Sequence, residues 1–435
     1  MKNIILLLLL TSSRLFAQQP SKIIDFNDFM LIEKVEDQEK QYQSMLQANS
    51  GVTLPDSLTN DLRAELAFAW LAKGNVERYQ HYKSTKPNFS ARQFLYLSNA
   101  LEKLFDEKKD YRSVEKISES LLQEIKVGAL ADDLGRSPII MELNAAANAR
   151  LGNIDKATTM LKSITQSVEA SSREIPYFKD HKSNFINRSS IVMLLSGQYQ
   201  EAFNLLSIAY KHADSNPYMD ATFKEVYQKV KGKDQGFDTY LKVLKDEAYN
   251  NYYKEVAKLY IAVPKLPLEA TIADPDDANE KVTLFRADKP VHDITLNNLA
   301  NKPVALGDYK GKVLVIDFWT TLCTPCVAAF SGFDKVVADY SKDQLQLFVI
   351  NLFESERTVQ AYVAQKGINL NVLRDEENLA YDVKGTPTKM VFDTQGNMRF
   401  YSSGYAGSTD REYYKLKAMV EMTKNGLRST QTSSR

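Results

Sequence analysis

Cysteine is almost absent from this chain of 435 residues: there are two, Cys323 and Cys326, with two residues between them. A network of structural disulfides is therefore excluded, and so is a zinc site built from cysteines alone. A Cys-x-x-Cys pattern leaves three interpretations, which are a redox pair, half of a mixed zinc site, and a chance arrangement.

An excess of charge of either sign is also missing. Lysine plus arginine and aspartate plus glutamate both total 55, so the formal net charge is zero. No broad basic field is available to attract phosphates, and we expect no nucleic-acid partner. The chain length suggests about two or three domains.

A hydrophobic run long enough to span a membrane is absent as well. The apolar run near the start, Ile4–Leu10, is far shorter than the roughly 20 residues that a spanning helix needs. Lys2 precedes this run and Ala17 follows it, which predicts a secretory signal peptide over residues 1–17. The alternative is a short buried helix. We expect an exported mature chain without a transmembrane anchor, in the periplasm or cell envelope.

Proline, glycine and strand-like patterns are sparse over residues 25–263. Apolar residues recur at every third or fourth position, which predicts helices. A glycine, or in one case a lysine, separates successive helices, as a left-handed cap would. These turns lie at Gly74, Lys109, Gly152, Gly197 and Gly232. Their irregular spacing predicts a tetratricopeptide-like stack of helix pairs, with an ordinary helical bundle as the alternative.

The helical pattern fades at a stretch rich in proline and acidic residues. Pro264 and Pro267 and the acidic cluster after them predict a linker over residues 264–284. Beyond it we expect a second domain over residues 285–425, and a polar tail over 426–435.

The periodicity changes in this second domain. HDITL and PVAL predict a hairpin, and KVLVIDFW is a continuous apolar run typical of a strand buried on both faces. A helix, a strand, a helix, two further strands and a closing helix follow. This is the order of a thioredoxin fold. The predicted fold class is therefore an α-helical, solenoid or bundle N-terminal domain followed by an α/β thioredoxin fold.

Cys323 falls where the buried strand meets the next helix. Unpaired N–H groups and the positive end of the helix dipole favour a thiolate at that place. Cys326 lies one helical turn on, within reach of a disulfide bond. Pro325 fits the first helical turn, where its missing N–H costs nothing. The pair can attack a disulfide, form a mixed disulfide and resolve it.

Two stretches, LGDYKGKVLVIDFWTTLCTPC and YDVKGTPTKMVFDTQGNM, resemble the TlpA/ResA-type thiol-disulfide oxidoreductases of the AhpC/TSA/redoxin superfamily. The resemblance covers about residues 285–423. It implies that Cys323 is the exposed nucleophile and Cys326 the resolving thiol. It also implies disulfide-containing client proteins and a membrane or periplasmic electron donor, with no cofactor and no metal.

The resemblance implies further roles around the two cysteines. Trp319 would pack beside the disulfide, and Pro387 would be a cis-proline, following Thr386, that faces it. Asp317 matches the buried acid beneath the cysteines, where burial raises a carboxyl pKa and suits the group to take or return a proton. The plainer alternatives are a solvated acid at the strand edge and a tryptophan that only fills the core.

The chain departs from the family pattern at four positions. Leu322 stands where tryptophan is usual, Thr324 replaces glycine, Ala329 replaces an acid, and Ser331 replaces the proline that kinks the helix. These changes make the substrate face more apolar or less acidic and leave the redox potential open. They leave both sulfurs and both expected prolines in place.

The same residues bear on rival functions. Zinc would need a second pair of ligands, and the nearest histidine in sequence is His292. A peroxidase of the peroxiredoxin kind needs Pro-x-x-x-Thr-x-x-Cys, and Ile316 stands at the proline position. A different class is a non-enzymatic protein-binding module of the cell envelope, with the thioredoxin-like domain as scaffold. The fold leaves open the client and the direction of exchange, which could be reduction, oxidation or isomerisation.

Overall fold

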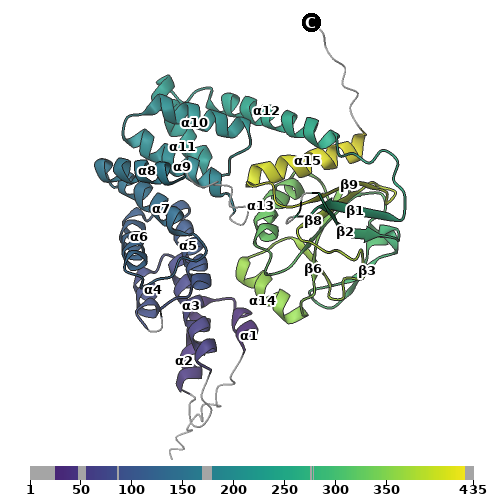
Figure 1. Cartoon of the computed structure of the whole chain (residues 1–435), viewed down its shortest axis with the longest axis horizontal. Helices are drawn as coiled ribbons and strands as arrows, with labels where there is room; N and C mark the ends of the chain where they lie inside the picture. The colour runs from purple at the N-terminus through teal and green to yellow at the C-terminus, as the bar shows by residue number, and fades with distance from the viewer. Residues whose placement is uncertain are drawn as a thin grey trace, which may run out of the picture.

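The computed structural model describes residues 25–47, 55–85, 88–168, 179–274, 277 and 279–426. The expected signal peptide and nearly all of the expected polar tail lie outside these residues. Figure 1 shows a helical N-terminal region that curves along one side of a C-terminal region built on a sheet. The predicted fold class, helices followed by a thioredoxin fold, is confirmed.

The described part of the N-terminal region contains helices and no strand. The helices are α1 (Phe26–Met30), α2 (Val35–Gln47), α3 (Asp56–Ala72), α4 (Val76–Lys83), α5 (Ala91–Asp106), α6 (Tyr111–Lys126), α7 (Ser137–Arg150), α8 (Ile154–Val168), α9 (His181–Leu195), α10 (Tyr199–Lys211), α11 (Met219–Lys231) and α12 (Phe237–Ala257).

Each predicted turn between helices has a residue in the left-handed region. Gly74, Gly152, Gly197 and Gly232 have φ between 72° and 90°, and Lys109 has φ of 55°. A residue with a Cβ is strained there by roughly 1–2 kcal/mol, which explains the glycines. The helices that flank these glycines pack on one another in pairs, for example α3 on α4 and α7 on α8. The tetratricopeptide-like type of stacking stays a prediction.

The C-terminal region is built on a seven-stranded sheet in the order β4-β3-β7-β6-β5-β8-β9. Its elements are β3 (Thr295–Asn298), β4 (Pro303–Ala305), β5 (Val313–Trp319), α13 (Thr324–Asp339), β6 (Leu345–Leu352), α14 (Glu356–Lys366), β7 (Asn371–Asp375), β8 (Thr388–Phe392), β9 (Met398–Ser403) and α15 (Thr409–Asn425). The hairpin of β3 and β4 was predicted and is present. All seven residues of β5 are buried, between parallel β6 and antiparallel β8.

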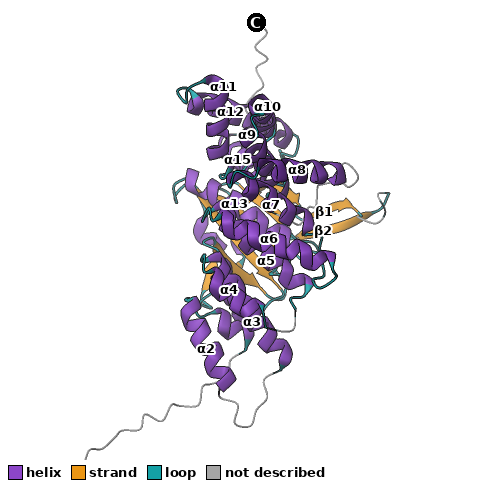
Figure 2. Cartoon of the chain, turned by 90° about the vertical axis from the view of Figure 1, so that its left-hand side faces the viewer, coloured by secondary structure: helices purple, strands orange, loops and turns teal. Residues whose placement is uncertain are grey.

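The prediction of a linker over residues 264–284 is wrong for most of that stretch. It contains β1 (Leu268–Ala273) and the first part of β2 (Lys281–Ala287), which form an antiparallel hairpin (Figure 2). The hairpin packs on the sheet through Phe285, whose ring lies edge-on to Tyr401 at 5.3 Å between centroids. Of the acidic residues that suggested a linker, Asp274, Asp277 and Glu280 lie between the two strands of this hairpin.

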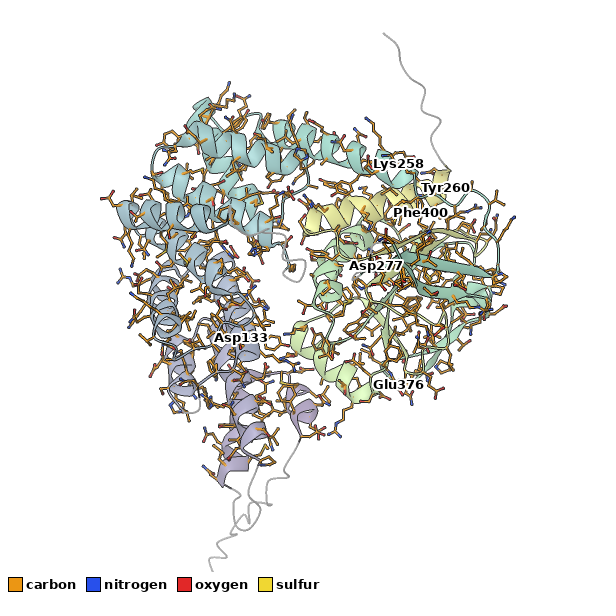
Figure 3. All side chains as sticks on the ribbon, in the orientation of Figure 1. Asp133, Lys258, Tyr260, Asp277, Glu376 and Phe400 are labelled. Atoms are coloured by element: carbon orange, nitrogen blue, oxygen red, sulfur yellow. A yellow bond between two sulfur atoms is a disulfide. The ribbon has the colours of Figure 1, made fainter. Side chains whose placement is uncertain are left out.

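The chain that leaves α12 is also attached to the sheet. Tyr260 packs edge-on against Phe400, with ring centroids 5.3 Å apart (Figure 3). The N–H of Ile261 donates to the carbonyl of Arg399 at 2.9 Å, and the Arg399 guanidinium donates back to the Ile261 carbonyl at 3.1 Å. These contacts therefore attach the segment between α12 and β1 to strand β9.

Within the described residues, the helical region meets the helices of the C-terminal region at two places. At the first, which we call the α15 contact, Asp180 accepts hydrogen bonds from the N–H and the hydroxyl of Thr409 at 2.5 and 2.7 Å. Ser215 donates to Asp410 at 2.5 Å. Helix α12 packs along α15 beside these bonds. The start of α15 is thus held by residues from the helical region.

At the second place, which we call the α14 contact, α1, α3 and α5 face α14. Asn27 donates to the hydroxyl of Thr358 at 3.3 Å, and Gln365 donates to the carboxylate of Glu65 at 2.7 Å. Helix α14 follows β6 in the chain, so this contact lies beside the carboxyl ends of β5 and β6.

Candidate functional site

The two cysteines lie where β5 ends and α13 begins. Cys323 is the N-cap residue of α13, and its carbonyl accepts hydrogen bonds from the N–H groups of Cys326 and Val327 at 3.1 and 3.3 Å. The cysteines form a disulfide with 5.3 Å between their Cα atoms. Pro325 occupies the first turn of the helix, as the sequence predicts. The first helical turn therefore brings the two sulfurs together.

The two sulfurs differ in access to solvent. Cys323 is 9% exposed, whereas Cys326 is fully buried at 0%. Cys326 Sγ lies 4.0 Å from the carbonyl oxygen of Phe318, beneath the end of β5. Leu322, beside Cys323, is 73% exposed. An incoming sulfur can therefore approach Cys323 along an apolar rim, and it cannot approach Cys326 without rearrangement.

Trp319, the last residue of β5, lies in the core cluster that also contains both cysteines. Its ring packs edge-on against Phe330 of α13 at 5.4 Å and tilted against Tyr362 of α14 at 5.9 Å. Its indole N–H is buried and has no hydrogen-bond partner among the described residues. Trp319 thus connects the cysteine helix to α14, and its role beside the disulfide stays a prediction.

The peptide bond between Thr386 and Pro387 is cis. Thr388, the next residue, pairs with Phe318 across β5 and β8, which brings the proline to the end of β5 from which the cysteine loop departs. The carbonyl of Pro387 accepts a hydrogen bond from the N–H of Gly404 at 3.1 Å. The sequence thus located the cis peptide, and its catalytic role stays a prediction.

Asp317 is completely buried, in agreement with the predicted buried strand. Neither of its carboxyl oxygens has a hydrogen-bond partner among the residues that the structure describes. Burial raises the pKa of Asp317 to about 8; the positive charges of Lys389 and Lys415 oppose this shift and Glu412 adds to it. A carboxyl with this pKa can hold or release a proton near neutral pH.

A buried ion pair lies next to Asp317. Lys389 is the register partner of Asp317 across β5 and β8, and its ammonium forms an ion pair with Glu412. Both side chains are at most 3% exposed. Burial opposes ionisation of Glu412, yet Lys389 and Lys415 hold its pKa below the usual range. The charged pair is therefore stable only as a pair, because either member alone would be an uncompensated buried charge.

Sequence reasoning missed Lys389 and Glu412. The signal for Lys389 was present, because a lysine in the middle of the apolar strand TKMVF needs a buried partner. Glu412 reaches it because Gly332 allows α13 and α15 to approach closely. A Cβ added at Gly332 would lie 2.7 Å from the Cβ of Glu412.

The loop before Cys323 is fixed by an acid from the neighbouring strand end. Glu354, which follows β6, accepts a hydrogen bond from the N–H of Thr321 at 2.7 Å and also contacts its hydroxyl. Asn351 donates to the same carboxylate at 2.6 Å. The position of Thr321, two residues before the exposed cysteine, is thus set by the sheet.

Within the residues that the structure describes, no group of three or more His, Cys, Asp or Glu side chains is arranged to hold a metal ion. A search of the same residues for a helix both long and apolar enough to cross a bilayer finds none.

Residues 287–401 match the AhpC/TSA family model. Over 138 residues, which are 31% of this chain and 78% of the relative, the chain is 25% identical to the thiol-disulfide oxidoreductase ResA of Halalkalibacterium halodurans. It is also 25% identical over 123 residues to ResA of Geobacillus kaustophilus, covering 28% of this chain and 71% of that relative. These matches agree with the resemblance drawn from the motifs, and they support a redox enzyme.

The chain is also similar to parts of several solved structures. A secreted Mycobacterium tuberculosis disulfide oxidoreductase homologous to E. coli DsbE is 20% identical, with a TM-score of 0.26, over 29% of this chain and 94% of that chain. A thiol:disulfide interchange protein of Chlorobium tepidum is 22% identical, with a TM-score of 0.27, over 30% and 96%.

Proposed function

We propose that this protein is an exported thiol-disulfide oxidoreductase that reduces or exchanges disulfides of client proteins through Cys323 and Cys326. The observation that carries the proposal is the asymmetry of the pair. Cys323, at a helix N-terminus, keeps a residue exposure of 9%, whereas Cys326, one turn further along, is fully buried at 0%. The relatives named ResA support the activity, and the N-terminal segment before residue 18 supports export.

In the reducing direction, the Cys323 thiolate attacks one sulfur of a client disulfide. A mixed disulfide forms, and the first client sulfur leaves as a thiolate. The Cys326 thiolate then attacks the Cys323 sulfur, which releases the second client thiolate and leaves the Cys323–Cys326 disulfide. The client gains two electrons and the protein loses two. A separate membrane or periplasmic donor would return the protein to the dithiol.

The buried carboxyl of Asp317 is the proposed proton acceptor for Cys326. The Cys326 thiol must lose a proton before its sulfur can attack, and bulk water does not reach it. With a pKa of about 8, Asp317 is suited both to take this proton and to return it in the reverse reaction. Trp319, Pro325 and the cis peptide of Thr386 and Pro387 would shape the face on which the client lies.

Trapping experiments in the full-length chain test the roles of the two cysteines. The Cys326→Ser variant is expected to accumulate mixed disulfides with client proteins, because the resolving thiol is gone. Cys323→Ser is the matched control and should trap none. In the reduced wild type, an alkylating agent at neutral pH should modify Cys323 first. Faster modification of Cys326, or equal trapping by both variants, would refute this assignment.

Export and the use of the helical region are tested separately. Amino-terminal sequencing of the protein from the cell envelope should give a mature chain that begins near residue 18. We also propose that the helical region selects clients, since linking a second binding surface to the redox domain raises effective concentration. A protein-binding module with an inert thioredoxin-like scaffold is the alternative, and it predicts that replacing both cysteines leaves partner binding and cell phenotype unchanged.

A further inference from the structure

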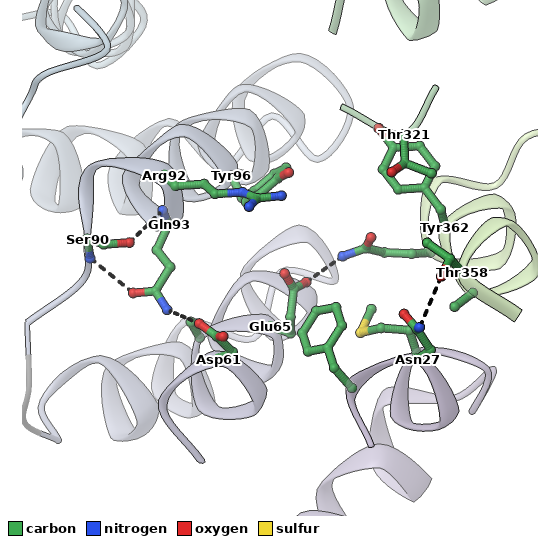
Figure 4. A pocket seen from close by; sticks show the side chains of 15 residues that line it. Asn27, Asp61, Glu65, Ser90, Arg92, Gln93, Tyr96, Thr321, Thr358 and Tyr362 are labelled. Atoms are coloured by element: carbon green, nitrogen blue, oxygen red, sulfur yellow. Dashed lines mark hydrogen bonds between the residues drawn. The ribbon is translucent and has the colours of Figure 1, made fainter. Parts of the chain in front are cut away.

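The α14 contact encloses a cavity that belongs to neither region alone. Its volume is about 330 Å³. Helices α1, α3 and α5 line one side, and α14 with Thr321 lines the other (Figure 4). This volume falls within the range of ligand pockets, which is about 300–1,000 Å³.

The cavity is lined in part by the loop that leads to Cys323. Thr321 lies two residues before Cys323, and with about 3.8 Å between consecutive Cα atoms the two Cα atoms are at most ~7.6 Å apart. The hydrogen bond from Thr321 to Glu354 holds this rim in place. An extended peptide advances about 3.3 Å per residue. A residue that flanks a client cysteine therefore reaches the cavity while the cysteine reaches Cys323.

The walls of the cavity are aromatic and its polar groups are mostly paired. Phe26, Tyr96 and Tyr362 contribute rings from three different helices. Of the two acids in the lining, Glu65 accepts from Gln365 at 2.7 Å and Asp61 accepts from Gln93 at 2.9 Å. Burial raises the pKa of Glu65, which reduces the negative charge inside. A bulky side chain can therefore enter without leaving these groups unpaired.

Two cations border the aromatic walls. Lys366 places its ammonium 4.3 Å from the centre of the Tyr96 ring, and burial lowers its pKa. Arg92 is exposed on the same side as Tyr96, and no described residue forms an ion pair with it. In Figure 4 its side chain runs alongside Tyr96, on the wall that faces Thr321 and Tyr362. A free guanidinium matches a carboxylate through two parallel hydrogen bonds.

We propose that this cavity is a client subsite for extended, flexible polypeptide segments. In such a segment a bulky side chain fills the aromatic-lined cavity, and a carboxylate within about three residues of the client cysteine pairs with Arg92. The subsite rests on the proposed function, because the segment is held there by the exchange at Cys323. It makes flexible segments with an acidic residue near the cysteine the preferred substrate class.

The test uses the reduced full-length Cys326→Ser protein and three synthetic peptides. Each peptide carries one cysteine as a mixed disulfide with thionitrobenzoate, with tyrosine on one side. The residue two positions from the cysteine is Glu, Gln or Lys. We expect the Glu peptide to react roughly tenfold faster than the Gln peptide, and the Lys peptide to be slowest.

Charge reversal separates the subsite from general electrostatics. Arg92→Glu should abolish the preference for the Glu peptide and favour the Lys peptide. The matched control is Arg112→Glu, an exposed arginine on α6 outside the cavity lining, which should leave the order of rates unchanged. Equal rates for all three peptides, or the same change in both variants, overturns the subsite and leaves the redox function intact. Failure of the wild-type chain to exchange with oxidised glutathione would instead refute the redox function.

Discussion

The two contacts between the helical region and the C-terminal region differ in how their charged groups are paired and in whether they leave a cavity. At the α15 contact, Asp180 and Asp410 are at most 5% exposed, and their carboxylates are engaged by groups from the opposite region. At the α14 contact, hydrogen bonds also cross between the regions, yet they surround a cavity and the Arg92 guanidinium, which has no ion-pair partner in the described part of the chain. A contact whose polar groups satisfy one another fastens two regions. A contact that leaves a cavity and an unpaired charge is suited to bind a further molecule.

The two contacts also reach different sides of the cysteine pair. The α14 contact touches its rim through Thr321. The α15 contact reaches its buried side, since Thr409 and Glu412 share the first turn of α15, and Glu412 holds Lys389 opposite Asp317. We expect substitutions on the α15 side to change mainly the free energy of unfolding, and substitutions at the cavity of the α14 contact to change mainly the rate of exchange with peptides.

The largest effect is expected for Glu412→Ala. This change leaves the buried ammonium of Lys389 without its partner, and removing one member of a buried ion pair destabilises by about 3–5 kcal/mol. Urea unfolding of the full-length protein should show this loss. The control is Glu255→Ala, which breaks the surface pair with Lys258 and should shift the free energy of unfolding by less than about 0.5 kcal/mol. Similar losses in both variants would show that the pair below the cysteines is not buried in solution.

A pH dependence is expected next, from Asp317. Its pKa is raised from 3.8 to about 8 in the folded protein. The stability that comes from its protonated form is therefore complete below pH 4 and is lost as the pH rises through 8. Relative to Asp317→Asn, which does not titrate, the wild type should lose stability between pH 5 and pH 8, by at most about 1.4 kcal/mol per pH unit. Parallel stability curves for the two proteins would contradict a buried, protonated Asp317.

Asp180→Ala should weaken the fastening at the α15 contact. It leaves the buried N–H of Thr409 without its acceptor and removes one of two partners of the Thr409 hydroxyl, which also contacts the Ser331 hydroxyl at 2.8 Å. The free energy of unfolding should therefore fall by about 1–3 kcal/mol. Exchange with oxidised glutathione should stay close to the wild-type rate. Asp155→Ala, an exposed acid at the start of α8, is the control and should change neither quantity. An unchanged unfolding midpoint for Asp180→Ala would refute the fastening role.

The smallest effect on stability is expected for Ala64→Leu at the cavity. The larger side chain extends into existing volume, so the free energy of unfolding should change by less than about 1 kcal/mol. Exchange with the peptides should slow several-fold, whereas exchange with oxidised glutathione should not. The control is Ala131→Leu, an exposed position outside the cavity. A slower reaction with both substrates would place the effect at the cysteines and not at the cavity.

Features set by neighbouring residues were predictable from the sequence. Strand β5 is visible because its run is apolar apart from Asp317, and the position of Cys323 at a helix start follows directly from that strand. Strand β7 was missed because Arg374 and Asp375 make it read as a surface segment. They are buried because Asp375 accepts hydrogen bonds from two backbone N–H groups of the following turn and Arg374 pairs with nearby acids.

Features that need distant elements to meet were not predictable. Lys389 and Glu412 lie more than sixty residues after the cysteines, and their meeting depends on the register of β8 and on the close approach of α13 and α15. The cavity depends on how α14 docks against three helices near the start of the chain. Neither the sequence of α14 nor the sequences of those three helices contain a local pattern that indicates this docking.

The hydrogen bond between Asn27 and Thr358 joins residues 331 positions apart, and the bond between Asp180 and Thr409 spans 229 positions. Contacts between such distant residues form slowly, because a long loop of chain must close before they gain anything. During synthesis α1 can pack on α2 and α3 as soon as these helices have formed, but it cannot contact α14 until the C-terminal domain has been made. We therefore expect the docking of the helical region on α14 to be the last step of folding. The cavity that we propose as the client subsite would form only in that step.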